Sequence, residues 1–218
     1  MIEISQHKQN IIGSRKAIEE LAGKDHARLL VISDSHGHYP TFEKIVRDYG
    51  EKCDALIFCG DGVCDIARLL YTAKSDKKLM SCIPPVIAAV RGNCDPATYP
   101  LDNGSLYFSD MIELCVNGRN LLIVHGHMQN VDFGVESLGL EMQVSDCKTG
   151  FYGHTHVAKE DNIKGYTFVN PGSCSRPRGG QQAGFAIATV EKSFVDISFI
   201  KMTLGGDGCT NYTIWSPF

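Results

Sequence analysis

The sequence lacks the features that mark membrane-bound and secreted proteins. None of its apolar runs approaches the roughly 20 residues that a helix needs to cross a bilayer. Residues 1–16 are polar and do not contain the apolar segment of a secretory signal. We therefore expect a cytoplasmic protein that does not associate with membranes.

Long runs of basic residues are also missing. The 21 Lys and Arg residues are outnumbered by 25 Asp and Glu residues, which gives a formal net charge of −4 at pH 7. Proteins that bind the nucleic-acid backbone are usually basic, so we expect no stable nucleic-acid binding. A phosphate ester would need a local source of positive charge to be held.

Cysteine is plentiful, but its spacing lacks the Cys-x-x-Cys pairs of structural zinc sites and redox motifs. The nine cysteines are odd in number, and several lie inside apolar stretches, such as Cys59 and Cys115. Free, mostly buried thiols in a reducing compartment are the expected state.

The chain of 218 residues is long enough for one domain with a substantial core. We predict an N-terminal extension over residues 1–27, with a short helix capped by Ser14, and a single domain over residues 28–218. The final segment, residues 205–218, is expected to form a loop.

Apolar runs at residues 28–33, 54–59 and 84–90 predict three buried strands, and helices are expected over residues 41–50 and 64–74. In the second half, the Asn117-Gly118 pair predicts a hairpin. A helix is expected over residues 131–147. Short strands are then expected at 156–163, 166–170, 184–191 and 193–201. This order predicts an α/β protein with mixed sheets.

Five polar motifs follow apolar strands, where open α/β sheets place their ligand sites. They are Asp34-x-His36, Gly60-Asp61, Gly92-Asn93-Cys94-Asp95, His125-Gly126-His127 and Gly153-His154-Thr155-His156. Each motif alone fits an ordinary turn or cap. Together they would gather two carboxylates, an amide and several of the eight histidines in one cleft.

Such a set of side chains predicts a metal site. Oxygen and imidazole ligands suit Mn, Fe, Zn or Ni, and no ligand of the thiolate type stands out in these motifs. Seven ligands are too many for one tetrahedral ion but suit two ions that share a bridging carboxylate. Two such ions activate a water molecule for displacement at phosphorus and supply the missing positive charge.

In their order and spacing these motifs resemble those of the calcineurin-like metallophosphoesterase superfamily. The variants DSHGH, GDG, RGNCD, HGH, GHTH and NPGSCSRPRGG are similar to the small bacterial and archaeal phosphodiesterases of the YfcE/MJ0936 type. The resemblance covers residues 28–201. It implies a four-layer α-β-β-α sandwich of two mixed β-sheets flanked by helices.

The resemblance also implies a role for each residue. Asp34, His36 and His156 would bind one metal ion, and Asp61 would bridge both ions. The second ion would be bound by Asn93, His125 and His154, and a hydroxide between the ions would attack phosphorus. Manganese is the expected metal, with Ni, Fe, Zn or Mg as alternatives, and a homodimer or tetramer is expected.

Further residues are expected at the catalytic site beside Asn93. Cys94 stands where many superfamily members have a histidine that acts on the leaving group, so we expect a preference for good leaving groups. We expect Asp95 to orient the loop around Asn93. His127 is expected to hydrogen-bond near the metals or substrate, with an ordinary loop histidine as the alternative.

Other side chains are weaker candidates. Arg176 and Arg178 could bind a phosphate oxygen, although solvated surface arginines are equally common. His38 could lie near the cleft. The segment Asn170–Ser173 is expected to form a turn that supports the site.

Several alternatives to a phosphodiesterase remain open. The same fold serves as a non-catalytic scaffold in the retromer complex, but that relative lacks some of the metal-site residues. A phosphomonoesterase would use the same site. A nuclease of the Mre11 type usually has additional basic regions, and protein phosphatases are generally longer.

Overall fold

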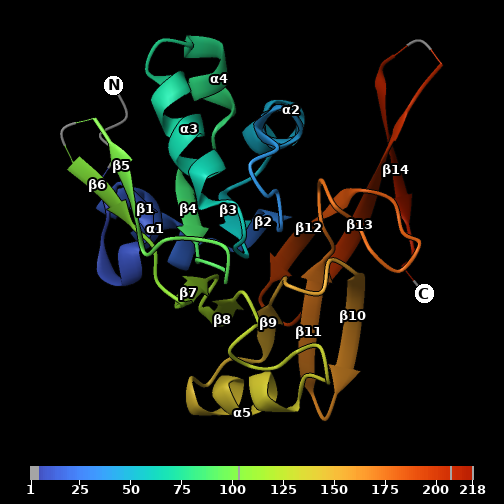
Figure 1. Ribbon diagram of the computed structural model, residues 1–218. Helices are drawn as coiled ribbons and strands as arrows, with labels where there is room; N and C mark the ends of the chain where they lie inside the picture. Colours follow the sequence, from blue (N-terminus) through green and yellow to red (C-terminus); the bar gives the residue numbers. More distant parts are fainter. Residues whose placement is uncertain (1–4, 103, 207, 218) are drawn as a thin grey trace.

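A seven-stranded mixed sheet forms the centre of the fold in the computed structural model, which describes residues 5–102, 104–206 and 208–217 (Figure 1). Its strand order is β1-β4-β3-β2-β12-β13-β14. β2, β3 and β4 are parallel, and β12, β13 and β14 continue the sheet in antiparallel pairs. The strands are β1 (Ile12–Gly13), β2 (His26–Ile32), β3 (Ala55–Phe58), β4 (Val86–Ala89), β12 (Gly184–Glu191), β13 (Val195–Leu204) and β14 (Thr210–Trp215).

A second mixed sheet packs against the first and has the strand order β10-β11-β9-β8-β7. β8, β9 and β11 are parallel, whereas β7 and β10 are antiparallel to their neighbours. The strands are β7 (Met111–Val116), β8 (Arg119–Val124), β9 (Thr149–Phe151), β10 (Ala158–Ile163) and β11 (Tyr166–Pro171). A separate two-stranded sheet is formed by β5 (Thr98–Leu101) and β6 (Gly104–Tyr107).

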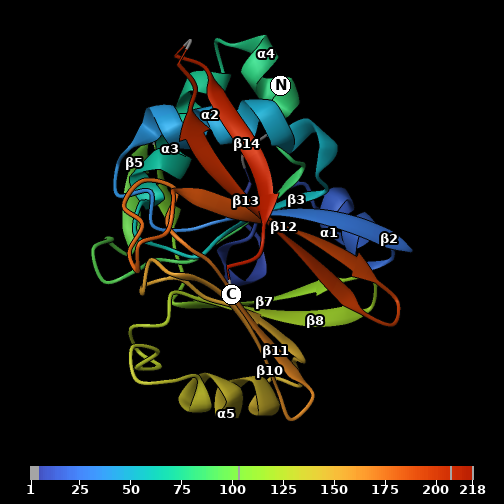
Figure 2. The same ribbon diagram turned by 90° about the vertical axis from the view of Figure 1, so that its right-hand side faces the viewer.

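Helices cover the outer faces of both sheets. α2 (Tyr39–Tyr49), α3 (Val63–Ala73) and α4 (Lys77–Cys82) lie on the seven-stranded sheet, and α5 (Glu136–Val144) lies on the five-stranded sheet (Figures 1 and 2). Two short 3₁₀ turns, η1 (Lys8–Asn10) and η2 (Gly50–Lys52), complete the elements. The predicted four-layer α-β-β-α sandwich is confirmed.

The alternation of side chains along each strand explains the layers, because successive residues face opposite sides of a sheet. In β2, Leu29 and Val31 join the core between the two sheets, whereas Leu30 and Ile32 join the core under the helices. A third apolar cluster, which includes Leu138 and Met142, seats α5 on its sheet. Apolar runs in the sequence therefore become strands that are buried on both faces.

The N-terminal residues lie at one edge of the seven-stranded sheet. Helix α1 (Arg15–Ala22) begins where the Ser14 side chain accepts a hydrogen bond from the backbone N–H of Ala17, as predicted. Strand β1 pairs with β4, and Leu21 is buried in the core between the sheets. The division into an extension and a domain at residue 28 stays a prediction.

Two expectations from the sequence need correction. The tail was expected to be a loop, but Thr210–Trp215 forms β14, which pairs with β13 as a projecting hairpin. Its Thr, Tyr, Ile and Trp residues favour strands, and the glycines before it make the turn. The helix expected over 131–147 is shorter because Gly134 has a φ of +138°, and α5 begins only at Glu136.

Other expectations agree with the structure. The hairpin at Asn117-Gly118 joins β7 to β8. Five cysteines are buried free thiols: Cys53, Cys59, Cys82, Cys147 and Cys174. Among the described residues, no helix is both long enough and apolar enough to span a bilayer.

Replacing Leu114 by alanine tests how the two sheets pack. Leu114 is buried between them, so we expect Leu114→Ala to lower the free energy of unfolding by about 2–5 kcal/mol. The matched control is Leu204→Ala, because the Leu204 side chain is 81% exposed. This substitution should change the free energy of unfolding by about 0.5 kcal/mol or less. Denaturant unfolding measures both, and equal losses would contradict the packing described here.

Candidate metal centre

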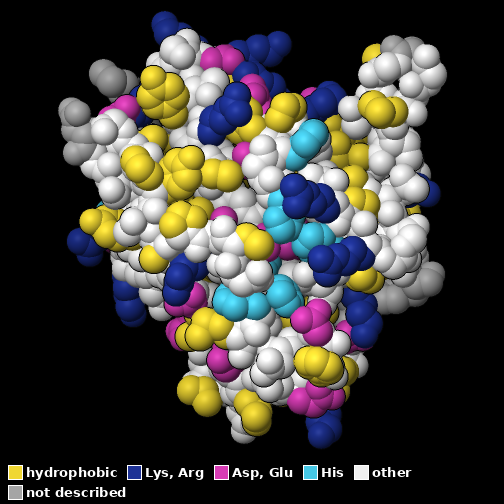
Figure 3. All heavy atoms as spheres, viewed as in Figure 1, with side chains coloured by type: hydrophobic (Ala, Val, Ile, Leu, Met, Phe, Trp, Pro, Cys, Tyr) yellow, Lys and Arg dark blue, Asp and Glu magenta, His cyan; other side chains and the backbone are white. Residues whose placement is uncertain are grey.

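The five polar motifs meet at one edge of the sandwich. Asp34 and Asp61 follow the parallel strands β2 and β3, and His125 and Gly153 follow β8 and β9 of the other sheet. Asn93 lies in the loop after β4. The histidine side chains on this face gather near its middle, with Lys and Arg side chains beside them (Figure 3).

One group of polar atoms contains Asp34, His36 and His156. The Nε2 atom of His156 lies 3.2 Å from Asp34 Oδ1 and 3.0 Å from His36 Nε2. His36 Nε2 is 3.9 Å from the same carboxylate oxygen. The three ligand atoms are therefore close enough to surround one ion.

A second group contains Asn93, His125 and His154. The side-chain oxygen of Asn93 lies 3.2 Å from His125 Nε2 and 3.0 Å from His154 Nδ1. These are the three residues expected at the second metal ion.

Asp61 lies between the two groups. Its Oδ2 atom is 3.7 Å from His36 Nε2, and its Oδ1 atom is 3.6 Å from His125 Nε2. The backbone N–H of Cys94 donates a hydrogen bond of 2.9 Å to Oδ1. One carboxylate oxygen thus faces each group, which is the arrangement required of a bridging ligand.

The other ring nitrogen of three histidines faces a hydrogen-bond acceptor. His125 Nδ1 is 2.7 Å from the carbonyl oxygen of Cys59, and His156 Nδ1 is 2.6 Å from that of Arg176. His154 Nε2 is 2.9 Å from Asp132 Oδ2. These contacts place the ring proton on the outer nitrogen and leave the inner lone pair for a metal ion.

The backbone of the ligand loops is strained. Asp34, His36, Asp61, His154 and His156 all have a φ between +47° and +70°. Residues other than glycine rarely adopt this left-handed conformation, and where they do it is often at functional sites. Five such residues around one cleft indicate that the fold imposes the ligand geometry.

Neighbouring loops approach so closely that two glycines are required. A Cβ atom on Gly92 would lie 2.1 Å from Asp61 Oδ1, and one on Gly153 would lie 2.0 Å from Ser33 Oγ. Ser33 itself donates a hydrogen bond of 2.6 Å to Asp34 Oδ2. Gly92 therefore lets two ligand loops of the seven-stranded sheet approach each other, and Gly153 lets a loop of the five-stranded sheet approach the loop of Asp34.

The end of β11 and the turn after it support the same loops. Asn170 Nδ2 donates to the carbonyl oxygen of Gly153, and Ser173 Oγ donates to that of Asp34. Both side chains are buried. The turn thus supports the loops that carry Asp34 and His154, in the manner expected from the sequence.

The donor set fits divalent metal ions. Asp34 Oδ1 is buried and has no hydrogen-bond partner among the described residues, although two imidazole nitrogens face it. A buried carboxylate oxygen without a partner carries a large desolvation cost unless a cation lies beside it. Carboxylate, amide and imidazole donors match Mn, Fe, Zn or Ni.

Comparison with known proteins agrees with this geometry. The calcineurin-like phosphoesterase superfamily domain matches residues 28–193. The chain belongs to this superfamily of metal-dependent phosphoesterases.

Relatives in the superfamily include phosphodiesterases. The probable metallophosphoesterase YsnB of Bacillus subtilis is 29% identical over 78% of this chain and 89% of its own length. Phosphodiesterase YfcE of Escherichia coli is 27% identical over 73% of this chain and 86% of its own length. Phosphodiesterase MJ0936 of Methanocaldococcus jannaschii is 28% identical over 66% of this chain and 82% of its own length.

Solved structures share the superfamily fold. A protein of Streptococcus pneumoniae described as a predicted phosphoesterase has a TM-score of 0.62 and 24% identity, covering 87% of this chain and 98% of that one. Vacuolar protein sorting 29 of Cryptosporidium parvum has a TM-score of 0.64 and 17% identity, covering 88% and 98%. These likenesses concern the fold alone.

Burial and neighbouring charges shift the pKa values of three expected ligands in different directions. Burial on its own raises the pKa of Asp61, but His125 and the Cys94 backbone N–H outweigh it, so the pKa is lowered. Burial lowers the pKa of His36, and the carboxylates of Asp61 and Asp34 offset this decrease only in part. Contact with Asp34 raises the pKa of His156, which therefore binds protons more readily than His36 in the metal-free protein.

The residues expected beside the ligands occupy distinct positions. Asp95 Oδ1 accepts hydrogen bonds from the backbone N–H groups of Gly62 and Val63, and its Oδ2 accepts one from Gly92. It thereby holds the loop that carries Asn93. Cys94 is exposed at the cleft. Partial desolvation, and to a lesser extent the nearby Asp61, raises the pKa of its thiol to about 11.

His127 lies close to the second group. Its ring centroid is 5.4 Å from that of His125 and 6.2 Å from that of His154. Its Nδ1 atom is buried without a hydrogen-bond partner among the described residues. Burial and the two neighbouring histidines lower the pKa of His127, so its ring is neutral near pH 7.

The arginine and histidine candidates lie at the rim. Arg176 and Arg178 are exposed, and their charges act on the pKa values of His36 and His156, respectively. Neither guanidinium forms an ion pair with a described residue. His38 is exposed at the start of α2, where its Nδ1 lies 2.8 Å from Thr41 Oγ1.

Asp132 is a site residue that the sequence did not reveal. It lies in the irregular segment before α5, and neither its spacing nor its neighbours mark it. Only the folded chain brings its carboxylate to His154.

Removing the Asp132 carboxylate tests whether it supports metal binding by the group of Asn93, His125 and His154. We expect Asp132→Ala to weaken binding of one of two Mn²⁺ ions by about 10- to 100-fold, because His154 loses the partner that fixes its ring. Calorimetric titration of chelator-stripped protein gives both stoichiometry and affinity. The control, Asp196→Ala at an exposed residue of β13, should bind as the wild type does, and unchanged binding in Asp132→Ala would exclude this role.

Proposed function

We propose that this protein is a dinuclear metal-dependent phosphodiesterase. The observation that carries the proposal is the position of Asp61, whose Oδ2 atom lies near His36 of the first group and whose Oδ1 atom lies near His125 of the second group. A single ion would leave half of these donors unused. Two divalent ions held there would lower the pKa of a water molecule between them and polarise the phosphoryl oxygens.

The chain's own residues supply the rest of the chemistry. Asp34 and Asp61 would balance the charge of the ions, and the ring nitrogens of His36 and His125 that face the centre would offer lone pairs. Asn93 binds through its side-chain oxygen. The buried Nδ1 atom of His127 has no hydrogen-bond partner in the described part of the chain and is suited to hydrogen-bond a phosphoryl oxygen or water.

Charge at the rim favours an anionic substrate. Arg176 and Arg178 add two unpaired cations beside the ligands, in a protein whose formal net charge is −4. Guanidinium groups match the geometry of phosphate oxygens. We assign both arginines to substrate binding.

Cys94 favours diesters with good leaving groups over substrates that need an acid catalyst. With its pKa raised to about 11, the thiol remains protonated near pH 7 and brings no positive charge. The relatives YfcE and MJ0936 carry the name phosphodiesterase. Manganese as the native metal, a cytoplasmic location and a homodimer or tetramer belong to the same proposal.

Two alternatives use the same centre. A phosphomonoesterase would prefer esters with one substituent. A scaffold would bind metal without turnover. Metal binding alone therefore does not distinguish an enzyme from a scaffold. A solved structure of Vps29 from Entamoeba histolytica, with a TM-score of 0.58 and 17% identity to this chain, is a complex with Zn²⁺. Turnover is therefore the deciding observation.

The decisive experiment measures hydrolysis of bis(p-nitrophenyl) phosphate and p-nitrophenyl phosphate by chelator-stripped protein titrated with Mn²⁺. We expect Mn²⁺-dependent turnover that favours the diester. Asp61→Ala should lower it by more than about 100-fold, since even a partner of a metal ligand accounts for 10- to 100-fold.

Asp196→Ala serves as the matched control and should retain wild-type turnover. A preference for the monoester would assign a phosphomonoesterase. No turnover with Mn, Ni, Fe, Zn or Mg would favour the scaffold.

Replacing Cys94 by histidine tests its effect on the leaving group. An imidazole titrates near neutral pH and donates a proton more readily than this thiol, so Cys94→His should speed hydrolysis of diesters with poor leaving groups by about tenfold or more. The readout is the ratio of kcat/KM for phenyl and p-nitrophenyl esters. Cys115→His, at an exposed cysteine near the far end of β7, should leave the ratio unchanged. The same ratio in Cys94→His and wild type would mean that position 94 does not act on the leaving group.

A further inference from the structure

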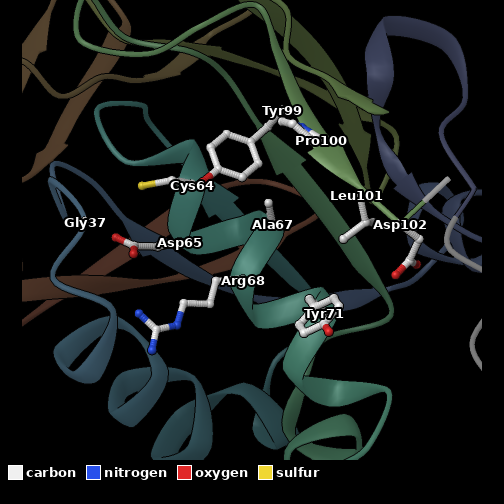
Figure 4. A pocket seen from close by; sticks show the side chains of 10 residues that line it. All are labelled: Gly37, Cys64, Asp65, Ala67, Arg68, Tyr71, Tyr99, Pro100, Leu101 and Asp102. Atoms are coloured by element: carbon white, nitrogen blue, oxygen red, sulfur yellow. The ribbon is translucent and has the colours of Figure 1, made fainter. Parts of the chain in front are cut away.

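A pocket of about 430 Å³ lies between α3 and β5 (Figure 4). One end is formed by Gly37, which directly follows His36, and by Cys64, in the first turn of the helix that follows Asp61. From there the pocket extends along α3, whose residues Arg68 and Tyr71 lie on the same face as Cys64. It therefore opens beside the metal centre.

The walls of the pocket are rich in rings and aliphatic groups. Figure 4 shows Tyr99 and Leu101 on the β5 side and Ala67 and Tyr71 on helix α3. Tyr71 is 62% exposed, so its ring is available to a ligand rather than used in the core. Such walls suit a flat apolar group, and the volume is that of an ordinary small-molecule site.

A cation is held at the same pocket. The guanidinium of Arg68 lies 4.4 Å from the centre of the Tyr39 ring, and Arg68 forms no ion pair with any residue that the structure describes. The buried Asp65 beside it accepts a hydrogen bond from Ser35. Arg68 thus keeps its donors for acceptor atoms at the edge of a planar ligand.

The two ends of the pocket differ. At the end away from the metal centre, Lys74 of the α3 C-terminus pairs with Asp102 after β5, which ties the helix to the strand. The other end, formed by Gly37 and Cys64, adjoins the loop that carries the expected ligand His36. A ligand in the pocket would therefore project its other part toward the metals.

We propose that this pocket binds the nucleoside part of a nucleotide phosphodiester whose phosphate lies at the metal centre. The proposal rests on the proposed function and names its substrate class. A base offers two apolar faces to Tyr71 and Tyr99 and acceptor atoms to Arg68, whereas an aliphatic alcohol offers neither. Stacking on aromatic side chains binds bases with little regard to sequence.

Binding of adenosine 5′-monophosphate and ribose 5-phosphate to Mn²⁺-loaded protein tests the proposal. The two ligands share sugar and phosphate, so calorimetry isolates the contribution of the base. We expect the nucleotide to bind about tenfold or more tightly, and Tyr71→Ala and Tyr99→Leu each to weaken it about tenfold without affecting ribose 5-phosphate. Equal affinities in the wild type, or unchanged nucleotide affinity in both variants, would overturn the assignment.

The matched control is Tyr107→Ala. Tyr107 is an exposed tyrosine on the neighbouring strand β6 that does not line the pocket. It should bind both ligands as the wild type does. Circular dichroism verifies that each variant is folded.

Saturation-transfer NMR with adenosine separates this proposal from the proposed function. Adenosine has no phosphate, so its contact with the pocket needs no metal. Transfer to the ring protons should occur in chelator-stripped wild type and Tyr107→Ala and be lost in Tyr71→Ala. No transfer in the wild type would exclude the pocket, whereas transfer in a protein without diester turnover would support the pocket and contradict only the phosphodiesterase.

Discussion

The burial of two carboxylates, Asp34 and Asp61, at the ends of adjacent parallel strands is the constraint on which the rest of the centre depends. Charges out of contact with water are costly unless cations or donors face them. Here the partners are imidazole nitrogens and backbone N–H groups from loops of both sheets. The ligand geometry is therefore a consequence of how the two sheets pack, and not of any one loop.

Strain is the cost of this convergence. The loops at Asp34, Asp61 and His154 adopt left-handed backbone conformations, which persist only where their surroundings enforce them. Hydrogen bonds supply that enforcement: Ser173 holds the carbonyl group of Asp34, Asp95 holds the turn after Asp61, and Asn170 holds Gly153. A centre fixed in this way needs little reorganisation when it binds ions and substrate.

Local signals in the sequence predicted an α/β protein with mixed sheets and the seven clustered side chains, whereas the four-layer sandwich was implied by the resemblance to the superfamily. Each apolar run marked a buried strand, and each motif stood at its end. Asp132 escaped prediction because a lone aspartate in an irregular segment carries no periodic signal, and its role depends on His154 from a distant strand. The strand β14 was missed because none of its residues is buried and they derive their order from pairing with β13.

Selectivity must come from outside the metal centre. Two divalent ions would attract any phosphate ester, so the ions alone would not give substrate selectivity. The fold is shared with Vps29, so the sandwich alone would not give it either. In our proposal, the surface that distinguishes substrates is the pocket between α3 and β5, which would contact the ester group. Because α3 begins directly after the Asp61 loop, the residues proposed to recognise the ester group lie on the helix that continues from the proposed bridging ligand.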